Sequence, residues 1–88
     1  MDNNINDKVK LIQTCGACPE QYDLNIEDVN IGYLRLRHGY FYAEYVPTSE
    51  IVYDAEPDGD GIFEEHERDK YLENAIYAIL KKHKEINA

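Results

Sequence analysis

A two-residue turn at His38-Gly39, flanked on both sides by alternating apolar and polar residues, is the feature that most limits the folds open to this chain. Glycine adopts a positive φ angle without steric cost, and a tight hairpin turn of the primed type requires such an angle. The segment from Ile31 to Val46 is therefore predicted to form a β-hairpin closed by this turn.

The turn also predicts the register of the hairpin, because residues on either side of a two-residue loop pair in a fixed order. The expected pairs are Arg37 with Tyr40, Leu36 with Phe41, Arg35 with Tyr42, Leu34 with Ala43 and Tyr33 with Glu44. Side chains alternate between the two faces of a strand. The face expected to meet the core carries Leu34, Leu36, Phe41, Ala43 and Tyr45. The face expected to point outward carries Tyr33, Arg35, Arg37, Tyr40, Tyr42 and Glu44.

Further strands are expected on both sides of this hairpin. Residues 21–26 alternate between apolar and polar, and residues 51–55 are rich in β-branched side chains, so each segment predicts one strand. Residues 1–13 are polar and rich in asparagine, and we expect them either to be disordered or to add an edge strand. The predicted sheet has three to four antiparallel strands.

A long C-terminal helix is predicted from about Ile62 to Ile86, with Asp60 as its N-cap. Apolar residues at spacings of three and four form one helical face, comprising Leu72, Ile76, Ile79, His83 and Ile86. A helix with such a face packs most simply on the apolar side of the hairpin. The predicted fold class is therefore α+β, with a small antiparallel sheet packed against one long helix in a single domain over residues 1–88.

The charge of the chain is strongly negative, with 18 acidic against 9 basic residues and a formal net charge of −9. This balance argues against strong binding to nucleic acid or to an anionic membrane and favours a partner protein with a basic surface or groove. No apolar run reaches the roughly 20 residues needed to span a bilayer, and no signal peptide is evident, so we expect a cytoplasmic protein. Between Glu44 and Glu73, eleven acidic residues face only Arg68 and Lys70.

The segment from Glu56 to Glu67 resembles the calcium loop of EF-hand proteins. The resemblance assigns metal-ligand roles to Glu56, Asp58, Asp60 and Glu67, with Gly61 at the sharp turn and the Ile62 carbonyl as a further ligand. It implies calcium as a cofactor of an accessory metal-binding domain. The alternative interpretation is an acidic loop before a helix N-terminus, where carboxylates are favourable without any metal.

Cys15 and Cys18 are separated by two residues, a spacing found in zinc sites, in redox dithiols and in ordinary structural turns. Zinc would need two further ligands, and only His38, His66 and His83 offer imidazole nitrogens. All three interpretations stay open at the level of the sequence.

The outward face of the hairpin interleaves arginine with tyrosine at Tyr33, Arg35, Arg37, Tyr40 and Tyr42. Such a face can stack on bases or bind a carboxylate-bearing peptide, and it can equally be cross-strand packing on an exposed sheet. We expect no enzymatic activity, because the chain offers no nucleophile placed beside a base and an orienting group.

In size and charge the chain resembles phage and mobile-element proteins that bind and inhibit host enzymes. Its strings at residues 15–23 and 32–41 resemble those of uncharacterised phage-type small proteins. The resemblance implies a protein-binding module that inhibits a nucleic-acid-processing enzyme by mimicking nucleic acid. The residues expected to meet the partner are Glu56, Asp58, Asp60, Glu64, Glu65, Glu67 and Asp69. The metal-binding domain and the binding of nucleic acid or peptide through the arginine and tyrosine face are the two alternatives.

Overall fold

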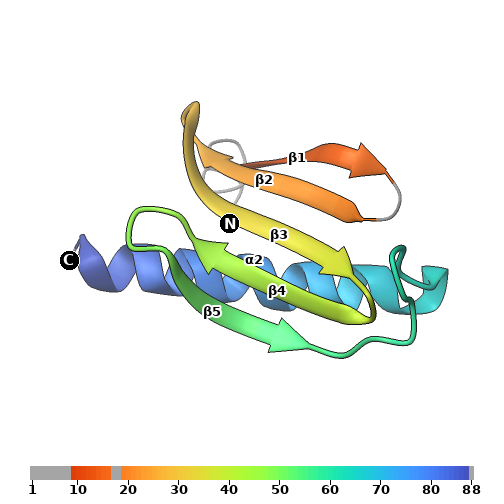
Figure 1. The fold of residues 1–88 in the computed structure, drawn as a ribbon. Helices are drawn as coiled ribbons and strands as arrows, with labels where there is room; N and C mark the ends of the chain where they lie inside the picture. Colours follow the sequence, from red (N-terminus) through yellow and green to blue (C-terminus); the bar gives the residue numbers. More distant parts are fainter. Residues whose placement is uncertain (1–8, 17–18, 88) are drawn as a thin grey trace.

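The computed structural model describes residues 9–16 and 19–87 of the chain, and these form one antiparallel sheet and one helix (Figure 1). The elements are β1 (Val9–Gly16), β2 (Glu20–Ile26), β3 (Val29–Arg37), β4 (Tyr40–Tyr45), β5 (Glu50–Ala55) and α2 (Glu65–Ile86). The strands lie side by side in the order of the sequence. The predicted α+β class is confirmed, while the predicted number of three to four strands is corrected to five in the described residues.

The central hairpin of β3 and β4 has the register that the sequence predicts. All five expected pairs occur, from Tyr33 opposite Glu44 to Arg37 opposite Tyr40. His38 and Gly39 have φ angles of 54° and 73°, as a primed two-residue turn requires. The apolar side chains of the hairpin are consequently buried, and Leu34, Leu36, Phe41 and Ala43 are fully inaccessible to solvent.

The additional strand is β1, which pairs with β2 along its length from Val9 opposite Ile26 to Gly16 opposite Glu20. A bulge between Gln13 and Cys15 interrupts the register. The expected edge strand in residues 1–13 is therefore confirmed for residues 9–13, whereas residues 1–8 lie outside the described part of the chain. The second half of β1 was not predicted as a strand, because its residues are mostly polar and the bulge breaks the alternation on which a sequence-based prediction depends.

Helix α2 covers one face of the sheet over β3, β4 and β5, and β1 and β2 extend beyond it (Figure 1). Its buried apolar residues are Leu72, Ala75 and Ile79, and Ile76 packs at the edge of the core. Ile86, expected on the buried face, is 49% exposed because the helix runs past the sheet at its C-terminal end. No helix in the described part of the chain is long and apolar enough to cross a membrane.

The helix starts three residues later than predicted, with Glu64 rather than Asp60 as the N-cap. Residues 61–63 stay outside the helix because the core and the sheet hold them. The ring of Phe63 packs edge-on against Phe41 with 4.9 Å between the ring centroids, and the Gly61 carbonyl accepts a hydrogen bond from the Glu20 N–H. These contacts outweigh the local preference of the segment for a helix.

Candidate functional site: an acidic end and an arginine and tyrosine face

The acidic loop between β5 and α2 is organised by the buried carboxylate of Glu67, the third residue of the helix. Its Oε1 accepts a hydrogen bond from the Asp58 N–H at 2.9 Å, and its Oε2 accepts hydrogen bonds from the N–H groups of Gly59 and Glu64 at 2.8 and 2.9 Å. Only glycine fits at position 59, because an added Cβ would lie 2.0 Å from the carbonyl oxygen of Ile62. Glu67 therefore holds residues 58–64 in one conformation.

The ionised form of Glu67 is the one that this environment favours. Burial alone would raise the pKa of Glu67, but the three backbone N–H groups and the neighbouring His66 more than offset burial and lower this pKa. Glu67 is 5% exposed, so the sequence interpretation of this residue as part of a partner-facing surface does not describe its position. The EF-hand resemblance predicts that the Glu67 carboxylate closes the loop by binding a metal ion. In the structure the carboxylate closes the loop by accepting hydrogen bonds from backbone N–H groups.

The four residues predicted to bind calcium are not gathered around one point. Asp58 and Glu67 do lie together, and with His66 they form a group whose ligand atoms are within 4.8 Å of one another. Asp60 instead lies beside the hairpin turn, where its carbonyl accepts a hydrogen bond from the Gly39 N–H at 2.7 Å. Calcium prefers six to eight oxygen ligands, and the oxygens of Glu67 are already engaged by N–H donors.

We expect Glu67→Gln to destabilise the protein by about 2 kcal/mol, because the amide NH₂ would face backbone N–H groups that lose their acceptor. We also expect melting curves recorded with millimolar calcium and with a chelator to superimpose. Differential scanning calorimetry measures both effects. The matched control is Glu65→Gln, two residues away and exposed, which should leave the melting temperature unchanged.

A calcium-dependent rise in melting temperature that disappears in Glu67→Gln would contradict this interpretation and establish the metal site, because a ligand that binds only the folded state stabilises it by mass action.

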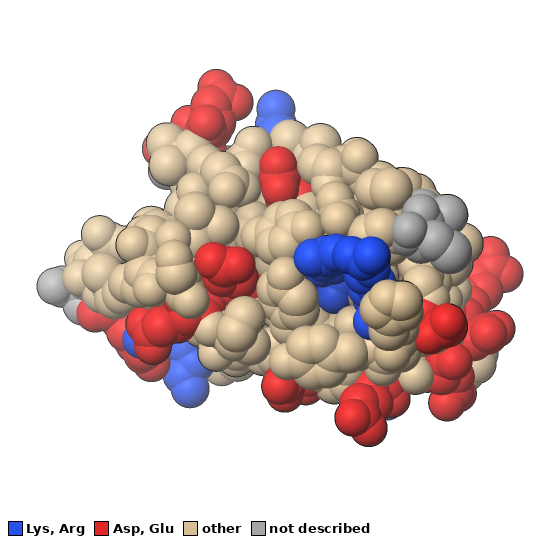
Figure 2. All heavy atoms as spheres, viewed as in Figure 1, with Lys and Arg blue, Asp and Glu red and all other residues tan. Residues whose placement is uncertain are grey.

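Six of the seven carboxylates predicted to meet a partner are exposed, and we call them the acidic end. They are Glu56, Asp58, Asp60, Glu64, Glu65 and Asp69. Figure 2 shows acidic side chains gathered at the end of the molecule where Figure 1 places the loop between β5 and α2. Arg68, on the first turn of α2, does not neutralise these carboxylates, since it pairs with the buried Glu20.

A buried charge network around Glu20, which no sequence pattern indicated, connects the start of β2 to the start of α2. The Glu20 carboxylate accepts hydrogen bonds from Arg68 Nε at 2.9 Å, from the Phe63 N–H at 3.0 Å and from the Tyr22 hydroxyl. Burial would raise the pKa of Glu20, but these donors and the charge of Arg68 together lower it. Burial and the Glu20 carboxylate raise the pKa of Tyr22 to about 12. The network is structural, because Glu20 is 1% exposed.

The arginines and tyrosines of the outward hairpin face do lie together on the side of the sheet opposite α2, with Glu44 beside Tyr33 on the same face. Tyr42 is central, with its ring centroid 6.1 Å from that of Tyr33 and 5.9 Å from that of Tyr40. Burial, followed by the proximity of Tyr42, raises the pKa of Tyr33, and the hydrogen bond that Tyr40 donates to Asp54 at 3.0 Å raises the pKa of Tyr40. The raised pKa values keep Tyr33 and Tyr40 neutral, and the three tyrosines present flat, amphipathic rings.

Arg35 is the distinctive residue of this face. Its Nε is buried and, among the described residues, has no hydrogen-bond partner. A buried donor without an acceptor costs about 1–3 kcal/mol, so the position is not explained by stability. Arg35, Arg37, His38, Tyr40 and Tyr42 line a shallow pocket of about 280 Å³. The sequence predicted which residues form this face, but it did not indicate that the Arg35 Nε would be buried without a hydrogen-bond partner.

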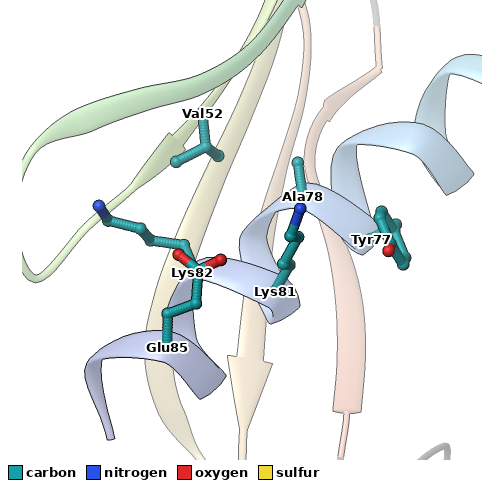
Figure 3. Close-up of a pocket in the computed structure, with 6 residues that line it drawn as sticks. All are labelled: Val52, Tyr77, Ala78, Lys81, Lys82 and Glu85. Carbon is teal, nitrogen blue, oxygen red and sulfur yellow. The ribbon is translucent and has the colours of Figure 1, made fainter.

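A second hollow, of about 310 Å³, lies at the seam between β5 and α2 (Figure 3). Val52 lies on the strand side, and Lys81, Lys82 and Glu85 lie on the helix side. Lys82 already pairs with Glu50, with 3.0 Å between Nζ and Oε1. One of the cations that line this hollow is therefore already paired, whereas the pocket at Arg35 contains a buried donor without a partner.

The cysteine pair cannot be assembled into a site from the described residues. Cys15 lies near the end of β1 and is partly buried, while Cys18 falls outside the described part of the chain. The zinc and redox interpretations stay predictions.

Comparison of the chain with protein-family models, with curated proteins and with solved structures gave no match.

Proposed function

We propose that this chain is a small protein-binding module whose acidic end docks against a basic surface of a partner protein. The observation that supports the proposal is that six exposed carboxylates stand on a loop and first helical turns that Glu67 holds in place. A charged surface that is ordered before binding loses little conformational entropy in the complex. Its field also accelerates encounter with an oppositely charged partner.

We further propose that the partner is an enzyme that processes nucleic acid and that the module inhibits it by occupying its basic groove. A groove that normally holds a phosphate backbone has the charge and the spacing of donors that a cluster of carboxylates can satisfy. The net charge of −9 supports this choice, since it disfavours binding of the module to nucleic acid itself.

The partner can be identified by affinity capture from extract of the native cells with mass spectrometry, and binding can then be measured with the purified protein. We expect reversal of Asp58, Asp60, Glu64 and Glu65 to lysine to weaken binding by about 100-fold or more, because like charges would then face one another. The association rate should also fall steeply with added salt, because screening shortens the reach of the field.

A matched pair of double variants separates a local surface from net charge. Glu64→Lys with Glu65→Lys changes the acidic end, whereas Glu73→Lys with Glu85→Lys makes the same change in charge farther along α2. We expect only the first pair to weaken binding strongly. Equal effects of the two pairs, or a larger effect of alanine at Arg35 and Arg37, would contradict docking through the acidic end.

A further inference from the structure

The pocket on the outward face of the sheet holds two positive charges that form no ion pair within the described part of the chain. Arg35 and Arg37 both line it, and no described residue forms a hydrogen bond or an ion pair with either guanidinium. Two other cations do have partners, since Arg68 pairs with Glu20 and Lys82 pairs with Glu50. Figure 2 shows the corresponding basic patch, surrounded by uncharged and acidic side chains.

Three carboxylates lie near Arg35 on this face, and none of them forms an ion pair with it. Asp23 on β2 and Glu44 on β4 both lie opposite Tyr33, diagonal to Arg35 on the neighbouring strands. Asp54 on β5 lies opposite Tyr42 on β4, which in turn lies opposite Arg35 on β3. Asp54 accepts its hydrogen bond from the Tyr40 hydroxyl instead. The described part of the chain thus supplies no acceptor for either guanidinium, and the buried Nε of Arg35 points to an acceptor that comes from outside it.

The geometry of Arg35 indicates how such an acceptor would bind. Its Nε is buried without a partner in the described part of the chain, while its terminal nitrogens, which make no hydrogen bond either, still reach solvent. A guanidinium that has lost part of its hydration gains more from a charged acceptor than a fully solvated one does. A carboxylate matches the spacing of two guanidinium N–H groups and can accept from both in parallel.

The surroundings select a small, singly charged and flat ligand. The rings of Tyr40 and Tyr42, with centroids 5.9 Å apart and planes tilted by 36°, form an aromatic wall on which a flat group can pack. The pocket volume of about 280 Å³ suits a group the size of one amino-acid residue. Asp60 lies close by, in an adjoining hollow that it shares with Arg37 and His38. Together with the net charge of −9, it disfavours phosphodianions and polyanions.

We propose that this pocket binds a carboxylate attached to an aromatic group, with the carboxylate on Arg35 and Arg37 and the ring against Tyr40 and Tyr42. Such a ligand is either the C-terminal residue of a partner polypeptide or a free aromatic acid. This site is separate from the acidic end, and its occupancy does not depend on the function proposed above.

The test uses ¹⁵N-labelled full-length protein and the Nε–H signals of its arginines, of which the chain has three. The ligands are N-acetyl-phenylalanine and its uncharged amide, which differ only at the carboxylate. We expect the acid to shift the Arg35 Nε–H signal with a Kd on the order of 1 mM, as suits a ligand of this size, and the amide to bind at least about tenfold more weakly. The Arg68 signal is an internal reference, since that Nε–H already donates to Glu20.

Variants locate the site. Arg35→Lys keeps the charge but removes the paired N–H donors, so we expect binding of the acid to weaken about tenfold, whereas Lys10→Gln removes an exposed charge on β1 and should have no effect. A thermal melt of each variant confirms that it is folded. A peptide ending in phenylalanine that binds more tightly than the free acid identifies a polypeptide C-terminus as the source, and equal affinities identify a small acid.

Three outcomes would overturn the proposal. The first is equal binding of acid and amide by the unmodified protein, which requires no variant to fold. The second is an unchanged Kd in folded Arg35→Lys. The third is tighter binding of a single-stranded oligonucleotide at the same signals, which would make this face a nucleic-acid site.

Discussion

Leu36→Asp is expected to leave the protein unfolded at room temperature. Leu36 is fully buried and lies opposite Phe41 in the hairpin, inside the cluster of buried side chains beneath α2. An unpaired carboxylate in such a site costs several kcal/mol, which is comparable with the whole stability of a domain of this size. Loss of the cooperative thermal transition, followed by circular dichroism, is the expected observation.

The neighbouring residue provides the control for this prediction. Arg37 follows Leu36 on the same strand, points to the opposite face and is exposed, so Arg37→Asp should retain a cooperative transition. The pair tests the register directly, since a shift of one residue would exchange the two faces. A Leu36→Asp protein that melts like the unmodified one would show that residue 36 faces solvent.

Arg68→Met is expected to lower the free energy of unfolding by about 3 kcal/mol. The substitution leaves the inaccessible Glu20 carboxylate without its cation, and removing one partner of a buried ion pair costs about 3–5 kcal/mol. We take the lower end of that range because the Arg68 side chain is 32% exposed. Urea unfolding at neutral pH measures the change. Lys82→Met is the matched control, because its partner Glu50 is exposed and such surface pairs contribute little.

Lowering the pH should reduce the difference in the free energy of unfolding between the unmodified protein and Arg68→Met. The pKa of Glu20 is lower in the folded state than its ordinary value of 4.5, so its contribution to stability is complete above that value. The contribution is lost as the pH falls through the lowered folded-state pKa. A difference in stability that stays constant from neutral pH down to below that pKa would show that Arg68 acts by packing and not through the charge of Glu20.

The hairpin and its two faces could be predicted because the signals that specify them are local. A turn glycine and strict alternation over residues 31–46 determine both the pairing and the buried side chains, and the pairs join residues close in the sequence. The arginine and tyrosine face follows from the same alternation. The α+β class and the C-terminal helix followed from periodicity that needs no knowledge of distant contacts.

Only the tertiary structure decided where the helix starts and which carboxylates are buried and hydrogen-bonded. Glu20 meets Arg68 across 48 positions of sequence, and with Phe63 in the core this contact keeps residues 61–63 out of the helix. The sequence predicted Glu67 as a metal ligand and as a partner-facing carboxylate, and the fold instead buries it as the acceptor of the N–H groups of the loop. A carboxylate has the same identity in the sequence whether it faces solvent or accepts buried N–H groups, because its partners are set by segments that only folding brings together.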